Sequence, residues 1–284
     1  MSPPRDTTAR AQETGPRGFD FGRAASLLTE ASARAGAAIM RHYHAGAEVE
    51  LKGDSSPVTC ADRDSEAIVL AALAELAPEV MVISEERFRG VEAPLPDRFF
   101  LVDPLDGTKE FIKKRSDFTV NIALIEGGRP RFGLVYAPAR ALLAVTPEAG
   151  KVVEVELPPN DAGASLERLA QKPLHARPVR GSGLTALVSH SHLDAETEAF
   201  LAKLDIAERS GVGSSVKFLA IARGEADVYP RFGPTMEWDT AAGQAVLEAA
   251  GGSVVGTDGQ PLSYGKVETG LRNPSFIAWG RARG

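Results

Sequence analysis

Apolar residues near the start of the chain recur every three or four positions between Phe19 and His44. This spacing predicts an amphipathic helix, and Asp20 stands where its side chain would cap the first turn. A second helix is expected from Asp62 to Leu76, where Pro78 would prevent its continuation. The chain is therefore expected to open with two helices.

Short apolar runs follow these helices. Val80–Ile83 and Phe99–Val102 have the length of strands, and acidic residues come directly after each of them. Phe118–Glu126 and Pro130–Pro138 are joined by Gly127-Gly128-Arg129, which is typical of a β-hairpin with a glycine turn. We therefore expect antiparallel strands here, with carboxylates at strand ends.

The second part of the chain alternates strand and helix patterns. Residues 158–178 carry Pro, Asn, Asp, Gly and Lys with weak periodicity and are interpreted as a surface connection. Beyond it we expect the strand Ala186–Ser189 and the helices Asp194–Leu204, Ser214–Ala222 and Asp239–Ala250, the last ended by Gly251. Together these patterns predict a layered α/β (α+β) fold.

Composition divides the chain further and limits its function. Residues 1–18 are rich in Pro, Arg, Thr and Gly and are expected to form a disordered tail, before an N-terminal α+β half at 19–157 and a C-terminal α/β half at 179–284. The net charge of −6 disfavours nucleic-acid binding. A lone cysteine, Cys60, and the lack of a membrane-length apolar run favour a cytoplasmic protein. Nothing in the sequence specifies an oligomeric state.

Asp103 and Asp106 follow a predicted strand, with Pro104 between them and Gly107 allowing a tight turn. Two converging carboxylates need a neutralising cation, and Mg²⁺ prefers such hard oxygen ligands. Thr108 could begin a short helix whose free amides would face a phosphate. The alternative is a plain turn, because Asp-Pro and Asp-Gly pairs are common turn formers.

Three further acidic positions are ambiguous by themselves. Glu85 and Glu86 end the strand before this one and could belong to a surface loop. Asp62 and Asp239 stand near predicted helix starts and could serve only as N-caps. Taken alone, these residues leave both alternatives open.

The segment Leu101–Phe111, together with Trp238–Gly243, resembles the two signature motifs of the inositol monophosphatase superfamily. Val58–Asp62 and Ile83–Glu86 precede them in the same order, so that the resemblance covers the chain from about Lys52 to Gly252. It implies a layered αβαβα sandwich of the inositol monophosphatase and fructose-1,6-bisphosphatase type, with two or three Mg²⁺ ions and inhibition by lithium.

The resemblance also implies roles for individual residues. Metal ligation falls to four carboxylates and one backbone carbonyl: Glu85, Asp103, Asp106, Asp239 and Leu105. Thr108 would lie beside Asp62 and Glu85, and these three residues are expected to orient the attacking water. The amides of Gly107 and Thr108 would hold the transferred phosphate.

Within the superfamily, three segments most resemble the bisphosphate nucleotidases: Leu51–Pro57, Lys109–Lys113, and Gly213–Phe218 followed by Tyr229–Thr235. This resemblance implies a Mg²⁺-dependent phosphomonoester hydrolase that converts adenosine 3',5'-bisphosphate to AMP and phosphate, in connection with sulfur assimilation. An inositol monophosphatase or sugar bisphosphatase is the alternative enzyme. A nucleotide sensor without catalysis is the alternative of another class.

For the second phosphate and the nucleoside, the expected ligands are Ser214, Lys217, Arg231 and His192. Lys217 would stand one turn into a helix, where its ammonium and the helix dipole both favour an anion. Its alternative is an ordinary solvated lysine. Arg231 could instead pair with a structural carboxylate, and His192 could face solvent.

Overall fold

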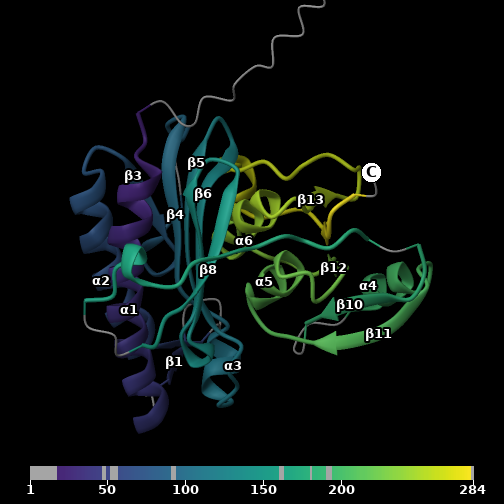
Figure 1. Cartoon of the computed structure of the whole chain (residues 1–284), viewed down its shortest axis with the longest axis horizontal. Helices are drawn as coiled ribbons and strands as arrows, with labels where there is room; N and C mark the ends of the chain where they lie inside the picture. The colour runs from purple at the N-terminus through teal and green to yellow at the C-terminus, as the bar shows by residue number, and fades with distance from the viewer. Residues whose placement is uncertain are drawn as a thin grey trace, which may run out of the picture.

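The computed structural model describes residues 18–46, 49–51, 57–90, 94–159, 163–179, 181–189 and 194–282. Its elements form five layers: two helices, a seven-stranded sheet, two helices, a five-stranded sheet and one outer helix (Figure 1). The layered αβαβα fold expected from the sequence is confirmed. The predicted tail and His192 lie outside the described residues, apart from Gly18.

The outer helical layer consists of α1 (Phe21–Ala45) and α2 (Cys60–Leu76). Asp20 caps α1 as expected, since its carboxylate accepts a hydrogen bond of 2.9 Å from the Arg23 amide. A small antiparallel sheet of β1 (Val49–Leu51) and β2 (Pro57–Thr59) lies between the two helices in sequence. No helix in the described parts of the chain combines the length and apolarity needed to cross a bilayer.

The seven-stranded sheet runs in sequence order: β3 (Met81–Ser84), β4 (Arg98–Asp106), β5 (Thr119–Glu126), β6 (Arg129–Ala137), β7 (Leu142–Glu148), β8 (Lys151–Glu156) and β9 (Lys172–Pro173). β3 pairs with β4 in parallel, and every later pair is antiparallel. The predicted hairpin is β5–β6, whose turn residues Gly127 and Gly128 have φ of 59° and 68°. These angles explain the two glycines.

The five-stranded sheet has the order β11 (Ile206–Gly211), β10 (Leu184–Val188), β12 (Val228–Arg231), β14 (Phe276–Trp279) and β13 (Ser253–Gly256). The predicted helices of this part are α4 (Ala195–Leu201), α5 (Val216–Ala222) and α6 (Glu237–Ala249). Short 3-10 turns occur at η1 (Glu85–Arg87), η2 (Pro138–Arg140), η3 (Leu166–Arg168) and η4 (Val267–Thr269). The division of the chain into two halves stays a prediction.

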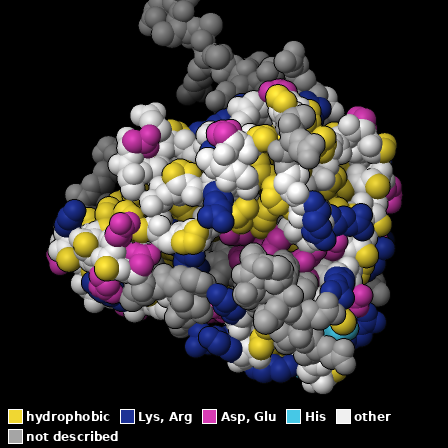
Figure 2. All heavy atoms as spheres, turned by 180° about the vertical axis from the view of Figure 1, so that it is seen from behind, with side chains coloured by type: hydrophobic (Ala, Val, Ile, Leu, Met, Phe, Trp, Pro, Cys, Tyr) yellow, Lys and Arg dark blue, Asp and Glu magenta, His cyan; other side chains and the backbone are white. Residues whose placement is uncertain are grey.

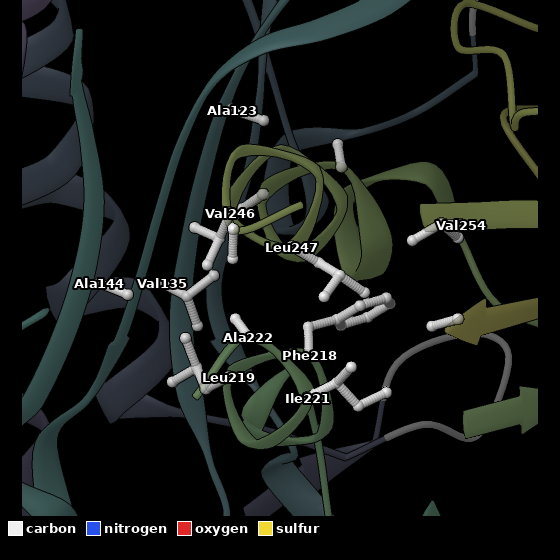
Figure 3. Packing of buried hydrophobic residues seen from close by; sticks show 14 of the residues in the cluster. Ala123, Val135, Ala144, Phe218, Leu219, Ile221, Ala222, Val246, Leu247 and Val254 are labelled. Carbon is white, nitrogen blue, oxygen red and sulfur yellow. The ribbon is translucent and has the colours of Figure 1, made fainter. Parts of the chain in front are cut away.

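Three hydrophobic clusters fill the spaces between the layers. One lies between α1–α2 and the large sheet, and a small one lies beside α4. The central cluster joins the large sheet, α5, α6 and the small sheet. In Figure 3, Phe218 of α5 and Leu247 of α6 point toward each other in the space between the two helices. A Cβ at Gly243 would come within 2.3 Å of the Phe218 ring, so glycine permits this close helix packing. The central layer thereby fixes the helix starts that reach the candidate site.

Several expectations need correction. β4 continues through Asp106, with a register shift after Asp103, so the acidic segment is an irregular strand end and not a turn following the strand. α2 and α6 begin two residues earlier than predicted, and their N-caps are Thr59 and Met236. Residues 158–178 are not simply a surface connection: they contain β9, and Leu166 is only 3% exposed.

Candidate active site

The irregular end of β4 carries the first carboxylates of the site. Asp103 is 1% exposed, and its Oδ1 accepts a hydrogen bond of 3.0 Å from the Leu105 amide. Gly107 follows with φ of 90° and leads into the short helix α3 (Thr108–Ile112). A Cβ at Gly107 would lie 2.8 Å from the Asp117 carbonyl oxygen, so this position needs glycine for both conformation and space.

Two other elements bring carboxylates to the same point. Glu85 begins η1, directly after β3, and Asp239 lies in the first turn of α6. Glu85, Asp103 and Asp239 each offer an oxygen within 4.8 Å of the other two. The structure therefore brings together acidic residues that are up to 154 positions apart in the sequence, counted from Glu85 to Asp239.

The electrostatics of this cluster are unfavourable without a cation. Burial, and then the carboxylates of Glu85 and Asp106, raise the pKa of Asp103 well above its ordinary value. Burial and the same kind of carboxylate repulsion also raise the pKa of Asp239. A divalent ion would neutralise the charge of this acidic cluster. The donor atoms of the cluster are all carboxylate oxygens, which Mg²⁺ prefers.

Asp106 is held from two directions. The Ser215 amide donates a hydrogen bond of 2.7 Å to Asp106 Oδ2, and the Thr119 hydroxyl lies 3.4 Å from the same oxygen. Burial raises the pKa of Asp106, while the Lys217 ammonium opposes that shift. This carboxylate therefore lies between the acidic cluster and a basic side chain.

Thr108 links α3 to the start of α2. Its hydroxyl lies 3.3 Å from Asp62 Oδ1 and 3.2 Å from the Leu105 carbonyl oxygen. The other Asp62 oxygen, Oδ2, accepts hydrogen bonds of 2.8 and 2.7 Å from the Thr59 amide and hydroxyl. Asp62 is therefore part of a helix cap and a neighbour of Thr108 at once.

A cavity of about 250 Å³ joins the acidic residues to basic ones. Glu85, Asp106 and Asp239 line it together with Ser214, Lys217 and Arg231. Figure 2 shows acidic side chains at a hollow near the middle of one face, with Lys and Arg side chains on either side. The site thus offers an acidic part and a basic part within one cavity.

The basic part is itself buried. Lys217 Nζ donates to the carbonyl oxygens of Val212 and Ser214, at 3.1 and 2.8 Å. Burial lowers the pKa of Lys217 to about 8, against the opposing effect of the Asp106 carboxylate. Arg231 donates hydrogen bonds to the carbonyl oxygens of Gly233 and Pro234, at 3.2 and 3.0 Å, and its positive charge is one of the causes that lower the pKa of the Asp194 carboxyl.

The sequence prediction of the site missed several residues. Ser189, Glu110, Tyr229 and Thr235 also line the cavity. Ser215 and Asn121 lie behind it and contact Asp106. Ser189, Thr235, Ser215 and Asn121 give no signal in one sequence, because buried Ser, Thr and Asn occur in many ordinary strands and helix starts. Glu110 and Tyr229 stand in segments that carry the resemblance, but nothing in the sequence assigns them a place in the cavity.

Comparison with known proteins agrees with this geometry. The model of the inositol monophosphatase family matches residues 23–280. The chain belongs to the inositol monophosphatase family, whose members are metal-dependent.

Curated relatives of this chain include proteins named 3'(2'),5'-bisphosphate nucleotidase CysQ. The protein from Shigella flexneri is 43% identical over 245 residues, which cover 85% of this chain and 94% of the relative. The protein from Escherichia coli strain K12 is 42% identical with the same coverage. Among solved structures, CysQ from Bacteroides thetaiotaomicron is 36% identical, with a TM-score of 0.78 and coverage of 94% of this chain and all of that one. The Thermotoga maritima IMPase, at 19% identity and a TM-score of 0.70, shares the fold.

Proposed function

We propose that this chain is a Mg²⁺-dependent 3'(2'),5'-bisphosphate nucleotidase that removes the 3'-phosphate of adenosine 3',5'-bisphosphate and leaves AMP. The observation that carries the proposal is the cavity in which Glu85, Asp106 and Asp239 lie with Lys217 and Arg231. A substrate with two phosphates would place one phosphate at the acidic part of the cavity and the other at the basic part. The relatives named CysQ support the same substrate class.

Glu85, Asp103, Asp106 and Asp239, with the carbonyl of Leu105, are the proposed Mg²⁺ ligands. The raised pKa values of the buried aspartates support a cation here, because uncompensated charges in such a cluster are costly. Bound ions of this kind supply Lewis-acid polarisation of phosphate oxygens and a water of lowered pKa. Magnesium as the ion, and the number of ions, belong to this proposal.

Thr108 and Asp62 are proposed to orient the attacking water and receive its proton. The Thr108 hydroxyl can accept a hydrogen bond from a water while it donates to Asp62 Oδ1, 3.3 Å away. Asp62 stays oriented because Thr59 holds its other oxygen. The backbone amides of Gly107 and Thr108, at the start of α3, are proposed to bind the phosphate oxygens as negative charge spreads over them.

Lys217 and Arg231 are proposed to bind the phosphate that is not cleaved, with Ser214 beside them. Lys217 is 3% exposed and Arg231 8% exposed, so both positive charges are largely desolvated. An anion bound near Lys217 would raise its lowered pKa again and strengthen the interaction. Among the described residues, Arg231 donates two of its five N–H groups, both to backbone carbonyls.

The test compares phosphate release from adenosine 3',5'-bisphosphate, inositol 1-phosphate and fructose 1,6-bisphosphate, in Mg²⁺ and with a chelator. The proposal expects the highest kcat/KM for the nucleotide and loss of turnover on chelation. An equal or higher kcat/KM for inositol 1-phosphate or fructose 1,6-bisphosphate would contradict the nucleotidase and indicate another phosphatase of this family. Tight nucleotide binding without any metal-dependent turnover would indicate a sensor.

A further inference from the structure

Ser215, which does not line the cavity, contacts three parts of the site. It is 1% exposed. Its amide donates to Asp106 Oδ2 at 2.7 Å, and its hydroxyl donates to the Asp239 carbonyl oxygen at 2.8 Å. The same hydroxyl accepts a hydrogen bond of 3.0 Å from Asn121 Nδ2. One small buried residue therefore joins two of the proposed metal ligands.

The elements joined at Ser215 are far apart in the sequence. Asp106 ends β4 and Asn121 lies on the neighbouring strand β5, whereas Ser215 precedes α5 and Asp239 lies on α6. Asn121 Nδ2 also makes a long contact of 3.5 Å with Asp106 Oδ2. The separation of the two aspartates thus depends on how the start of α5 sits against the strand ends.

The backbone before Ser215 is fitted to this position. The Gly213 amide donates 3.0 Å to Asp117 Oδ2, and Arg140 also pairs with the Asp117 carboxylate. A Cβ at Gly213 would lie 2.6 Å from Glu110 Cγ and 2.9 Å from Asp117 Cβ. The segment therefore approaches the end of β4 and α3 as closely as glycine allows, which leaves Ser215 little freedom to shift.

We propose that Ser215, supported by Asn121, is a positioning residue that fixes Asp106 and Asp239 relative to each other and so sets the affinity of the site for its metal. Groups that orient ligands in this way typically contribute about 10- to 100-fold to metal affinity or activity. Because Ser215 does not line the cavity, nucleotide affinity depends on it far less. The inference rests on the proposed function only for its kinetic consequences.

The test measures Mn²⁺ binding to the full-length protein, from the loss of the free-ion signal in electron paramagnetic resonance. Ser215→Ala should raise the Mn²⁺ dissociation constant about tenfold or more. With nucleotide as substrate, it should raise the Mg²⁺ concentration for half-activation and lower kcat, while KM changes by less than about twofold. Melting temperatures of all variants show whether they fold.

Ser32→Ala is the matched control. Ser32 is fully buried on α1, it does not line the cavity, and its hydroxyl has no hydrogen-bond partner among the described residues. This variant should keep wild-type Mn²⁺ affinity and kinetics. An equal loss of Mn²⁺ affinity in both serine variants would mean a general packing effect and overturn the proposal.

Asn121→Leu provides a second, independent variant in case Ser215→Ala does not fold. It should weaken Mn²⁺ binding in the same direction, and the double variant should lose less than the sum of the two single losses, since both act through one network. Wild-type Mn²⁺ affinity in the folded variants overturns the inference. Mn²⁺ binding without nucleotide hydrolysis by the wild type would overturn the proposed function, and the Mn²⁺ measurements would still decide the role of Ser215.

Discussion

Replacing Asp103 by Asn should have opposite effects on stability with and without magnesium. Asp103 is buried in a cluster whose oxygens lie within 4.8 Å of one another. At that separation, two unit charges repel by about 3.5 kcal/mol at an effective dielectric constant of about 20. Partial protonation relieves some of this repulsion, so we expect the metal-free variant to gain about 1–3 kcal/mol over the wild type.

The pH dependence follows from the raised pKa of Asp103. A carboxyl whose pKa is raised on folding gives relative stability below its ordinary value of 3.8, and this stability is lost as pH rises through the raised pKa. Without metal, the stability advantage of Asp103→Asn should therefore grow as pH rises above that value and level off above the raised pKa.

In saturating magnesium the wild type should instead be more stable than Asp103→Asn. An ion at 1,000 times its dissociation constant stabilises the wild type by about 4.1 kcal/mol, which exceeds the metal-free advantage of the variant, whereas the variant should gain little and show no turnover. Thermal melting in EDTA and in saturating Mg²⁺ measures both effects, at roughly 2–4 °C per kcal/mol. Asp97→Asn, at an exposed carboxylate before β4, is the control and should change neither. Lower stability of Asp103→Asn than of the wild type in EDTA would refute the reasoning, and so would a variant that Mg²⁺ stabilises as much as the wild type.

Further predictions concern the proton path, the basic part of the cavity, a buried ion pair and lithium. Thr108→Ala should lower kcat by about 10²–10⁴ with unchanged melting, and Thr108→Ser should restore most of it; an unaffected kcat would exclude the role of the hydroxyl. Lys217→Ala should raise KM for the bisphosphate far more than for inositol 1-phosphate, and equal effects on both would contradict a contact with the second phosphate. Glu237→Ala should cost about 3–5 kcal/mol in denaturant unfolding, because the fully buried Glu237 carboxylate lies 2.6 Å from Lys266 Nζ; a loss below about 1 kcal/mol would refute this. Lithium titrated at fixed Mg²⁺ should inhibit turnover, and complete insensitivity would count against the proposed metal site.

Elements with strong local signals could be predicted from the sequence. α1 has a long amphipathic stretch with a capping aspartate, and the β5–β6 hairpin has two adjacent glycines in its turn. β11 could not be predicted in the same way. Glu208, Arg209 and Ser210 interrupt any apolar run in Ile206–Gly211, and this segment is a strand because it pairs in parallel with β10.

The acidic residues of the site could be predicted because carboxylates after apolar strands are conspicuous, and a motif orders them along the chain. Their geometry could not. Pairing with β5 decides that β4 extends to Asp106, and the packing of α5 and α6 on the large sheet brings Ser215 to the same place. Such long-range contacts leave no periodic trace in a single sequence.

The most direct test of the account follows the two phosphates of adenosine 3',5'-bisphosphate by ³¹P NMR during turnover in Mg²⁺. In the proposed binding mode the 3'-phosphate lies at the acidic cluster and the 5'-phosphate near Lys217 and Arg231. We therefore predict loss of the 3'-phosphate signal, with AMP and inorganic phosphate as products. Formation of adenosine 3'-phosphate, or no phosphate release in Mg²⁺, would contradict it.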